Sequence, residues 1–327
     1  TLLTVLLAAV VARALSGGAV RLWAGGAALV LGLLPLALVP AEPEATEGAP
    51  VLRLVQPNVP QADKWNADLI DVFQARLLDL TATGDRPDLI IWPETAIPYL
   101  LEYSGSLLEA AVTAAGGVPM VIGVNRQEDG LYYNSLIVLD GAGDIIGTYD
   151  KQHLVPFGEY VPFGEVMGRL GIQGLAASEG GGFSAGQGVR RIDLPGIGAV
   201  EPLICYEAIF AEEIAKGDRP RALIQITNDA WFGTLQGPQQ HLAQSRLRAI
   251  EQGLPLVRVA NTGISAVIDA KGRIVAELPL GEAGKIDVAL PAAAEPTFYS
   301  RFGDLPAILA GIVLAFGFLA RSSRRSD

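Results

Sequence analysis

The sequence predicts an α/β domain that lies between apolar segments long enough to enter a membrane. The middle of the chain alternates short runs of branched apolar residues with stretches of helical periodicity, which is typical of strands buried on both faces between helices. Both ends of the chain carry uncharged apolar runs. The 327 residues are 50% hydrophobic and only 18% charged, whereas an ordinary soluble domain has about 25% charged residues.

The composition excludes several classes of protein. Disorder requires low hydrophobicity and high charge, and the single cysteine cannot close an internal disulfide. A net charge of −11 makes the chain a poor candidate for binding nucleic acid. One cysteine and two scattered histidines make a poor metal site. We therefore expect no metal, no cofactor and no nucleic-acid partner.

The apolar runs at the ends predict three membrane helices. Residues 22–40 carry no charge and are long enough to span a bilayer. The run within 1–15 is also apolar. A signal peptide is the alternative interpretation of these first two runs. Residues 305–320 form a shorter run, for which a buried core helix is the alternative. The expected domains are a partial membrane domain over 1–41, a catalytic domain over 42–300, and a membrane helix with a cytoplasmic tail over 301–327.

Arginines set the expected orientation of these segments. Arg13 and Arg21 lie between the first two apolar runs, and Arg321, Arg324 and Arg325 follow the third. The positive-inside rule assigns both groups to the cytoplasm, so residues 42–300 are expected on the outer side of the membrane.

Periodicity predicts the elements of the middle domain in order. Strands are expected over 51–55, 88–92, 120–124, 135–140, 145–149, 199–204, 222–227, 256–260, 265–268 and 274–276, and helices over 67–81, 106–115, 208–216 and 239–253. Gly141–Gly143 predicts a hairpin turn. Residues 163–188 are rich in glycine and lack a period, which indicates either a functional lid or disorder.

Three chemically active side chains follow apolar strands. Cys205 ends the strand 199–204, and the helix expected after it would expose the thiol and lower its pKa. Glu94 follows 88–92 and Lys151 follows 145–149. Taken singly, each has an ordinary alternative: a buried structural cysteine, a helix-capping or solvated carboxylate, and a surface lysine.

Taken together, these residues indicate acyl transfer. Strand ends are where sites form in open α/β sheets. A carboxylate can deprotonate a thiol, and an ammonium with the backbone N–H of Tyr206 can stabilise an oxyanion. A cysteine paired with His153 or His241 is an alternative that fits the strand ends less well.

The motifs around these residues resemble the nitrilase, or carbon–nitrogen hydrolase, superfamily. They are LVQPNVPQADKWN at 54–66, IIWPETAIP at 90–98, YDKQHLVPFGEYVPFGE at 149–165, ICYEAIF at 204–210, and the run from ITNDAWFG to SAVID at 226–269. The match is closer to one branch, the apolipoprotein N-acyltransferases, and covers roughly 51–290.

The resemblance implies the fold and the roles of the site residues. The fold would be an αββα sandwich placed between the last two membrane helices of the family. Glu94 would be the general base, Lys151 the oxyanion-stabilising cation and Cys205 the nucleophile. Glu159 would be a second carboxylate that positions Lys151 and assists proton transfer. Three further residues match positions around the substrate pocket, namely Trp65, Tyr206 and Glu207.

The resemblance also implies a reaction and a location. A phospholipid would acylate Cys205, and a diacylated apolipoprotein would accept the chain from the thioester. We expect a monomer in the bacterial inner membrane with its catalytic domain on the periplasmic side. Because the family has further membrane helices before the point where this chain begins, we expect an N-terminally truncated chain. A membrane-anchored amidase for small C–N substrates and a binding module without chemistry are the rival interpretations.

Overall fold

The computed structural model describes residues 2–15, 25–30, 33, 48–162, 182–188 and 191–313. The chain divides into two compact units, one over Pro43–Arg301 and one formed by Thr1–Glu42 with Phe302–Asp327. All the predicted site residues belong to the unit Pro43–Arg301.

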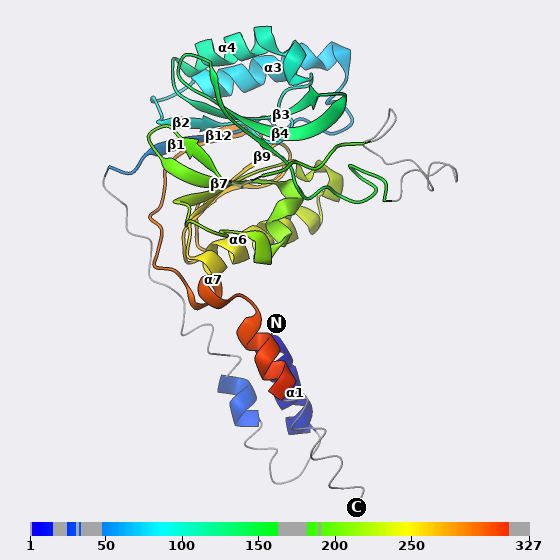
Figure 1. Ribbon diagram of the computed structural model, residues 1–327, viewed down its shortest axis with the longest axis vertical. Coiled ribbons are helices and arrows are strands. Elements are labelled where there is room, and N and C mark those ends of the chain that lie inside the picture. The colour runs from blue at the N-terminus through cyan, green and yellow to red at the C-terminus, as the bar shows by residue number, and fades with distance from the viewer. Residues whose placement is uncertain are drawn as a thin grey trace, which may run out of the picture. The chain divides into compact units, whose positions relative to one another are not determined.

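Two six-stranded sheets lie face to face within the described part of Pro43–Arg301 (Figure 1). The first has the order β12 (Gly284–Ala289), β1 (Val51–Gln56), β2 (Leu89–Ile91), β3 (Met120–Glu128), β4 (Leu131–Leu139) and β5 (Ile145–Asp150). The second has the order β11 (Ile274–Leu278), β10 (Ser265–Ile268), β9 (Leu256–Ala260), β8 (Ala222–Thr227), β7 (Gly198–Ile204) and β6 (Ile192–Leu194). The central strands β1–β3 and β7–β9 run parallel, and the flanking strands are antiparallel.

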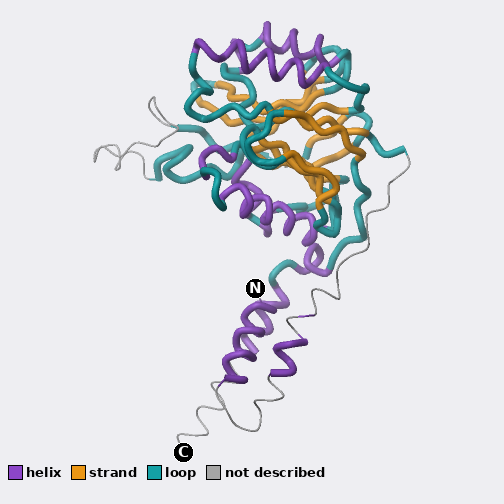
Figure 2. The backbone as a smooth tube through the Cα atoms, turned by 180° about the vertical axis from the view of Figure 1, so that it is seen from behind, coloured by secondary structure: helices purple, strands orange, loops and turns teal. Residues whose placement is uncertain are grey.

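Helices cover the outer faces of both sheets. The helices α3 (Ala67–Ala82) and α4 (Gly105–Ala115) lie on the first sheet, and α6 (Gly237–Gln252) lies on the second (Figures 1 and 2). The helix α7 (Phe298–Phe302) follows the last strand. The order of layers is helix, sheet, sheet, helix, so the αββα sandwich that the resemblance implied is confirmed.

Alternation along each strand divides the hydrophobic side chains among three layers. In β2, Leu89 and Ile91 point to the neighbouring sheet, where they join a core that includes Ile204 and Ile226. Ile90 points the other way and packs with residues of α3 and α4. Both faces of the central strands are thus buried, which explains why their sequences are mostly apolar. The buried polar residues among them include Arg53, Gln225 and Arg258.

Most elements confirm the predictions, but the helix expected over 208–216 is wrong. Two short 3₁₀ turns, Cys205–Ile209 and Ala211–Glu213, take its place. Ala215, within that range, has φ +57°, a value that an α-helix does not contain. Two strands were not predicted, β6 and β12, which lie at the edges of the two sheets and are short or interrupted by charged residues.

The end segments form helices over Leu2–Leu15, 25–30 and 305–313. Among the residues that the structure describes, no helix has the length and apolar character needed to cross a membrane. Most of the span predicted over 22–40 and residues 314–320 of the third run lie outside the described residues. Most of the segment 163–188 lies outside them as well, so neither interpretation of that segment is tested.

Gly123 on β3 lets the chain around Glu94 lie directly on the first sheet. A Cβ at this position would be 2.3 Å from the carbonyl oxygen of Pro93 and 2.7 Å from the Cα of Glu94. We expect Gly123→Ala to destabilise the fold by about 1–3 kcal/mol, because overpacking forces the backbone to move. The midpoint of thermal unfolding should fall by roughly 2–4 °C per kcal/mol.

Gly105→Ala is the matched control, because no atom lies within 4 Å of a Cβ built there and the residue begins α4. Its unfolding midpoint should stay the same or rise, since alanine favours a helix over glycine. Equal midpoints for the two variants would contradict close packing at Gly123.

Candidate active site

The ends of three strands meet at one cavity of about 650 Å³. The first sheet supplies Glu94, shortly after β2, and Lys151, directly after β5. The second sheet supplies Cys205, directly after β7. Glu159, from the loop after Lys151, lines the same cavity. The structure therefore brings together four side chains that were selected from three separate segments of the sequence.

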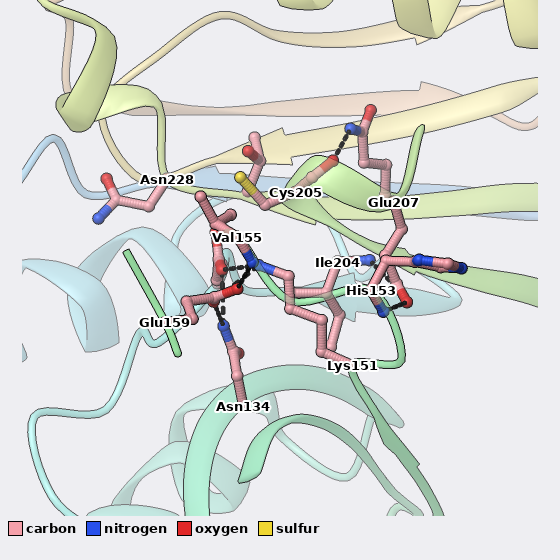
Figure 3. A network of polar contacts seen from close by, with 12 residues as sticks. Asn134, Lys151, His153, Val155, Glu159, Ile204, Cys205, Glu207 and Asn228 are labelled. Carbon is pink, nitrogen blue, oxygen red and sulfur yellow. Dashed lines mark hydrogen bonds and ion pairs between the residues drawn. The ribbon is translucent and has the colours of Figure 1, made fainter. Parts of the chain in front are cut away.

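Lys151 lies at the centre of this group (Figure 3). Its side chain is 1% exposed, and its Nζ is 2.8 Å from Oε1 of Glu159 and 3.5 Å from Oε1 of Glu94. Burial on its own lowers the pKa of a lysine, but Glu94, the side chain of Cys205 and Glu159 together raise the pKa of Lys151 above its ordinary value. Lys151 is therefore a permanent cation at neutral pH and cannot serve as the base.

Asn134 on β4 joins the two carboxylates, and the sequence analysis missed it. Its Nδ2 donates to Oε1 of Glu94 at 2.7 Å and to Oε1 of Glu159 at 3.1 Å (Figure 3). The backbone N–H of Val155 donates to the other oxygen of Glu159 at 2.8 Å. The signal that would have found Asn134 is a polar residue placed in a buried apolar strand, since such a residue needs a partner.

The two carboxylates differ in how fully they are bound. Both oxygens of Glu159 accept hydrogen bonds, so Glu159 is held as a fixed anion beside Lys151. The polar contacts of Glu94 with described residues are made through Oε1 alone. Its Oε2 is left for a proton, which suits a base better than a structural anion.

The setting of Cys205 corrects the prediction of an exposed thiol with a lowered pKa. The residue is 6% exposed, and a five-residue 3₁₀ turn follows it in place of an α-helix. Burial, assisted by the charge of Glu94, raises the pKa of the Cys205 thiol to about 12, although Lys151 opposes the shift. The resting thiol is thus protonated at neutral pH, and nucleophilic attack requires a base to remove its proton.

Buried polar groups hold the backbone of Cys205 from the side of the second sheet. Its carbonyl oxygen lies 3.1 Å from Nε2 of Gln225 and 3.1 Å from Nε2 of His241. Nδ1 of His241 lies 2.9 Å from Oδ1 of Asp229, and Arg258 donates to Oδ2 of Asp229 at 2.5 Å. These contacts maintain the positive φ of Cys205, a conformation that costs of order 1–3 kcal/mol for a residue other than glycine.

Glu207, predicted at the substrate pocket, is fully buried behind the nucleophile. Its Oε1 accepts from the hydroxyl of Tyr149 and the N–H of Gln152, each at 2.8 Å, and its Oε2 accepts from the N–H of Ile204 at 2.8 Å. Glu207 thus ties the segment that carries Lys151 to the strand that carries Cys205. In this arrangement it positions both residues rather than lining the cavity.

Of the two aromatic residues predicted at the substrate pocket, Trp65 lines the cavity and Tyr206 packs against another aromatic ring. The ring of Tyr206 packs edge-on against Phe210 at 5.2 Å. Trp65 is 53% exposed and lines the cavity, as do four aromatic residues that the sequence analysis did not select, Phe157, Phe183, Trp231 and Phe232. The cavity has charged groups at its catalytic centre and aromatic side chains elsewhere in its wall, a composition suited to a substrate with an apolar chain and a polar reacting bond.

Comparison with protein families matches residues 52–297 to the carbon-nitrogen hydrolase family. The apolipoprotein N-acyltransferase of Rhodopseudomonas palustris is 44% identical over 288 residues, which cover 83% of this chain and 54% of that protein. That of Bradyrhizobium diazoefficiens is 40% identical over 325 residues, which cover 93% of this chain and 60% of that protein. The chain therefore spans little more than half the length of these curated relatives.

Solved structures share the fold at low sequence identity. A carbon-nitrogen hydrolase from Helicobacter pylori has a TM-score of 0.55 at 18% identity, covering 74% of this chain and 88% of that one. The NitFhit protein of C. elegans has a TM-score of 0.58 at 20% identity, covering 76% of this chain and 62% of that one. The resemblance inferred from the sequence motifs is confirmed.

Replacing Glu94 or Lys151 should shift the pKa of the Cys205 thiol in opposite directions. The carboxylate of Glu94 raises the pKa of Cys205, so Glu94→Gln should lower that pKa and move alkylation by iodoacetamide to lower pH. Since Cys205 is the only cysteine, the pH of half-maximal alkylation reports this thiol alone. Lys151→Met should move the same pH upward, because it removes a cation that opposes the shift.

The control for these measurements is Glu109→Gln, which changes an exposed carboxylate on α4 and should leave the alkylation profile unchanged. A profile that moves upward in Glu94→Gln would contradict an anionic Glu94 beside a neutral thiol.

Proposed function

Since the chain belongs to the carbon-nitrogen hydrolase family, we propose that it is an N-acyltransferase that forms a thioester on its cysteine. Its acyl donor is a membrane phospholipid, and its acceptor is the N-terminal amine of a lipoprotein whose cysteine already carries a diacylglyceryl group. The names of the relatives that are 40% and 44% identical support this reaction class.

One observation carries the proposal: a neutral thiol, a base, and a cation held by a second carboxylate line one cavity together with aromatic side chains. Thioester chemistry requires the first three groups. An acyl chain requires an apolar wall, which the aromatic residues provide.

In the first half-reaction, Oε2 of Glu94 takes the proton of the Cys205 thiol as the sulfur attacks the carbonyl carbon of a phospholipid ester. We assign the reacting ester to the sn-1 chain. The charge that develops on the carbonyl oxygen is stabilised by Lys151 and the backbone N–H of Tyr206. The ester C–O bond then breaks, Glu94 returns the proton to the leaving oxygen, and a lysophospholipid departs. The acyl group remains on Cys205 as a thioester.

In the second half-reaction, the amine of the lipoprotein attacks the thioester carbonyl and gives a proton to Glu94. The C–S bond breaks, an amide forms, and the sulfur regains the proton from Glu94. Glu159 stays anionic throughout and keeps Lys151 charged. Its two hydrogen-bonded oxygens support this positioning role.

The proposed location follows from the substrates, both of which are lipids. We assign residues 1–41 and 301–327 to membrane segments and residues 42–300 to a catalytic domain on the periplasmic side of the bacterial inner membrane. The uncharged apolar runs at both ends of the sequence and the arginines beside them support this topology. Attachment to the bilayer raises the effective concentration of both lipids at the site.

The test is intact-mass spectrometry of the protein after incubation with phosphatidylethanolamine in detergent micelles. The wild-type chain should gain the mass of one acyl group, and a diacylglyceryl-cysteine peptide should remove it. Glu94→Gln should slow the gain by about 10²–10⁴-fold, which is the usual contribution of a general base. Cys205→Ala should show no gain.

An acyl mass that persists in Cys205→Ala would overturn the mechanism. Release of ammonia from small amides, without any acyl mass from phospholipid, would instead support the rival amidase. Retention of phospholipid without a covalent adduct would support a binding module.

A further inference from the structure

A second lysine lines the catalytic cavity and has no role in the mechanism above. Lys64 lies in the turn between β1 and α3, and its side chain is buried, with 7% exposure. It lines the same cavity as Glu94 and Cys205. Lysine is seldom buried to this extent unless its ammonium has a partner.

The turn that carries Lys64 is anchored rather than loose. The N–H of Asp63 donates to the carbonyl of Pro60, and the N–H of Asn66 donates to the carbonyl of Asp63, each at 3.0 Å. Nδ2 of Asn228, from the loop after β8, donates to Oε1 of Gln61 at 2.9 Å. Loops from both sheets therefore hold Lys64 at the wall of the cavity.

The other charged groups of this cavity are paired, whereas Lys64 has no partner among the described residues. Glu94, Glu159 and Lys151 bind one another or Asn134. The ammonium of Lys64 makes no hydrogen bond or ion pair with the described residues, and it lies 5.9 Å from the centroid of the Trp65 ring. Burial lowers the pKa of Lys64 to about 8, since Glu94 compensates only in part. An anion bound in the cavity would complete the missing pair.

We propose that Lys64 binds the phosphodiester of the phospholipid donor while the ester of the same lipid lies at Cys205. The assignment rests on the proposed function. The phosphodiester is the anion that phospholipids share, and it lies on the same glycerol as the reacting ester. An ammonium donates charge-assisted hydrogen bonds to phosphate oxygens. The diacylglyceryl-cysteine acceptor carries no phosphate, so Lys64 acts in the first half-reaction and not in the second.

Two donors with the same acyl chains, one with a phosphodiester head group and one without it, test this inference. Phosphatidylglycerol and the diacylglycerol with the same acyl chains are supplied to the full chain in nonionic detergent micelles, and thioester formation on Cys205 is followed by intact mass. Lys64→Gln should lower kcat/KM for phosphatidylglycerol by roughly 10- to 100-fold, the loss expected for a hydrogen bond to a charged group. The rate with diacylglycerol should stay at the wild-type value.

Three controls separate phosphate binding from a structural effect. Lys64→Arg keeps the charge and should retain most of the preference for phosphatidylglycerol. Lys271→Gln removes an exposed lysine and should change neither donor. Because each kcat/KM in a ping-pong reaction reports its own half-reaction, kcat/KM for a diacylglyceryl-cysteine peptide should be unchanged in Lys64→Gln.

The possible results lead to different conclusions. An equal loss for both donors, in a variant whose unfolding midpoint is unchanged, overturns the assignment, as does an unchanged rate with phosphatidylglycerol. If Lys64→Gln lowers the unfolding midpoint, Lys64→Met preserves the apolar stem and replaces it in the same comparison. A wild-type chain that forms no thioester with either donor overturns the proposed function itself, and the assignment with it.

Discussion

The site depends on one buried ammonium, that of Lys151, and on the carboxylates that surround it. A charge removed from water is costly unless it is paired and hydrogen-bonded. Glu159 meets that requirement at 2.8 Å, and Glu159 is itself held by Asn134 and the backbone of Val155. Glu94 lies close enough to contribute charge while keeping one oxygen for proton transfer. The carboxylates that stabilise buried Lys151 therefore differ in what they can do: Glu159 is held by hydrogen bonds at both oxygens, and Glu94 keeps one oxygen that can accept a proton.

Cys205, the proposed nucleophile, differs from Lys151 because burial stabilises its uncharged form, whereas attack requires the thiolate. Burial raises the pKa of Cys205 to about 12, so in the proposed mechanism the thiolate is formed only as Glu94 accepts its proton. The backbone of Cys205 is strained as well, with φ +50°, and its carbonyl is held by Gln225 and His241. Glu207 connects this turn to the segment after β5, so the positions of the cation and the sulfur are coupled through one buried carboxylate. Strain and buried charge both persist because the surrounding layers are rigid.

Much of the fold was predictable, because both faces of the central strands are buried. Such strands are mostly apolar and rich in branched residues, and β1, β3, β7, β8 and β9 were predicted on that basis. The edge strands β6 and β12 were missed, since an edge position does not require a buried apolar run. The helix expected over 208–216 was wrong because its backbone makes tertiary contacts that local periodicity does not record. Arg248 donates to the carbonyl oxygen of Ile209 at 3.2 Å, and the N–H of Ala215, where φ is +57°, donates to Glu201 at 2.8 Å.

The sequence by itself was enough to select Glu94, Lys151 and Cys205 as candidates for the chemistry and to predict that each follows a strand, since they stand in distinctive motifs. Only the tertiary structure decided what those groups do to one another. Glu94 and Lys151 come from one sheet and Cys205 from the other, so their meeting depends on how the sheets pack. The roles of Asn134 and Lys64 likewise became visible only in the folded structure. A polar side chain in a strand and a lysine in a turn look ordinary until the structure shows that Asn134 is paired and that Lys64 has no partner in the part of the chain that it describes.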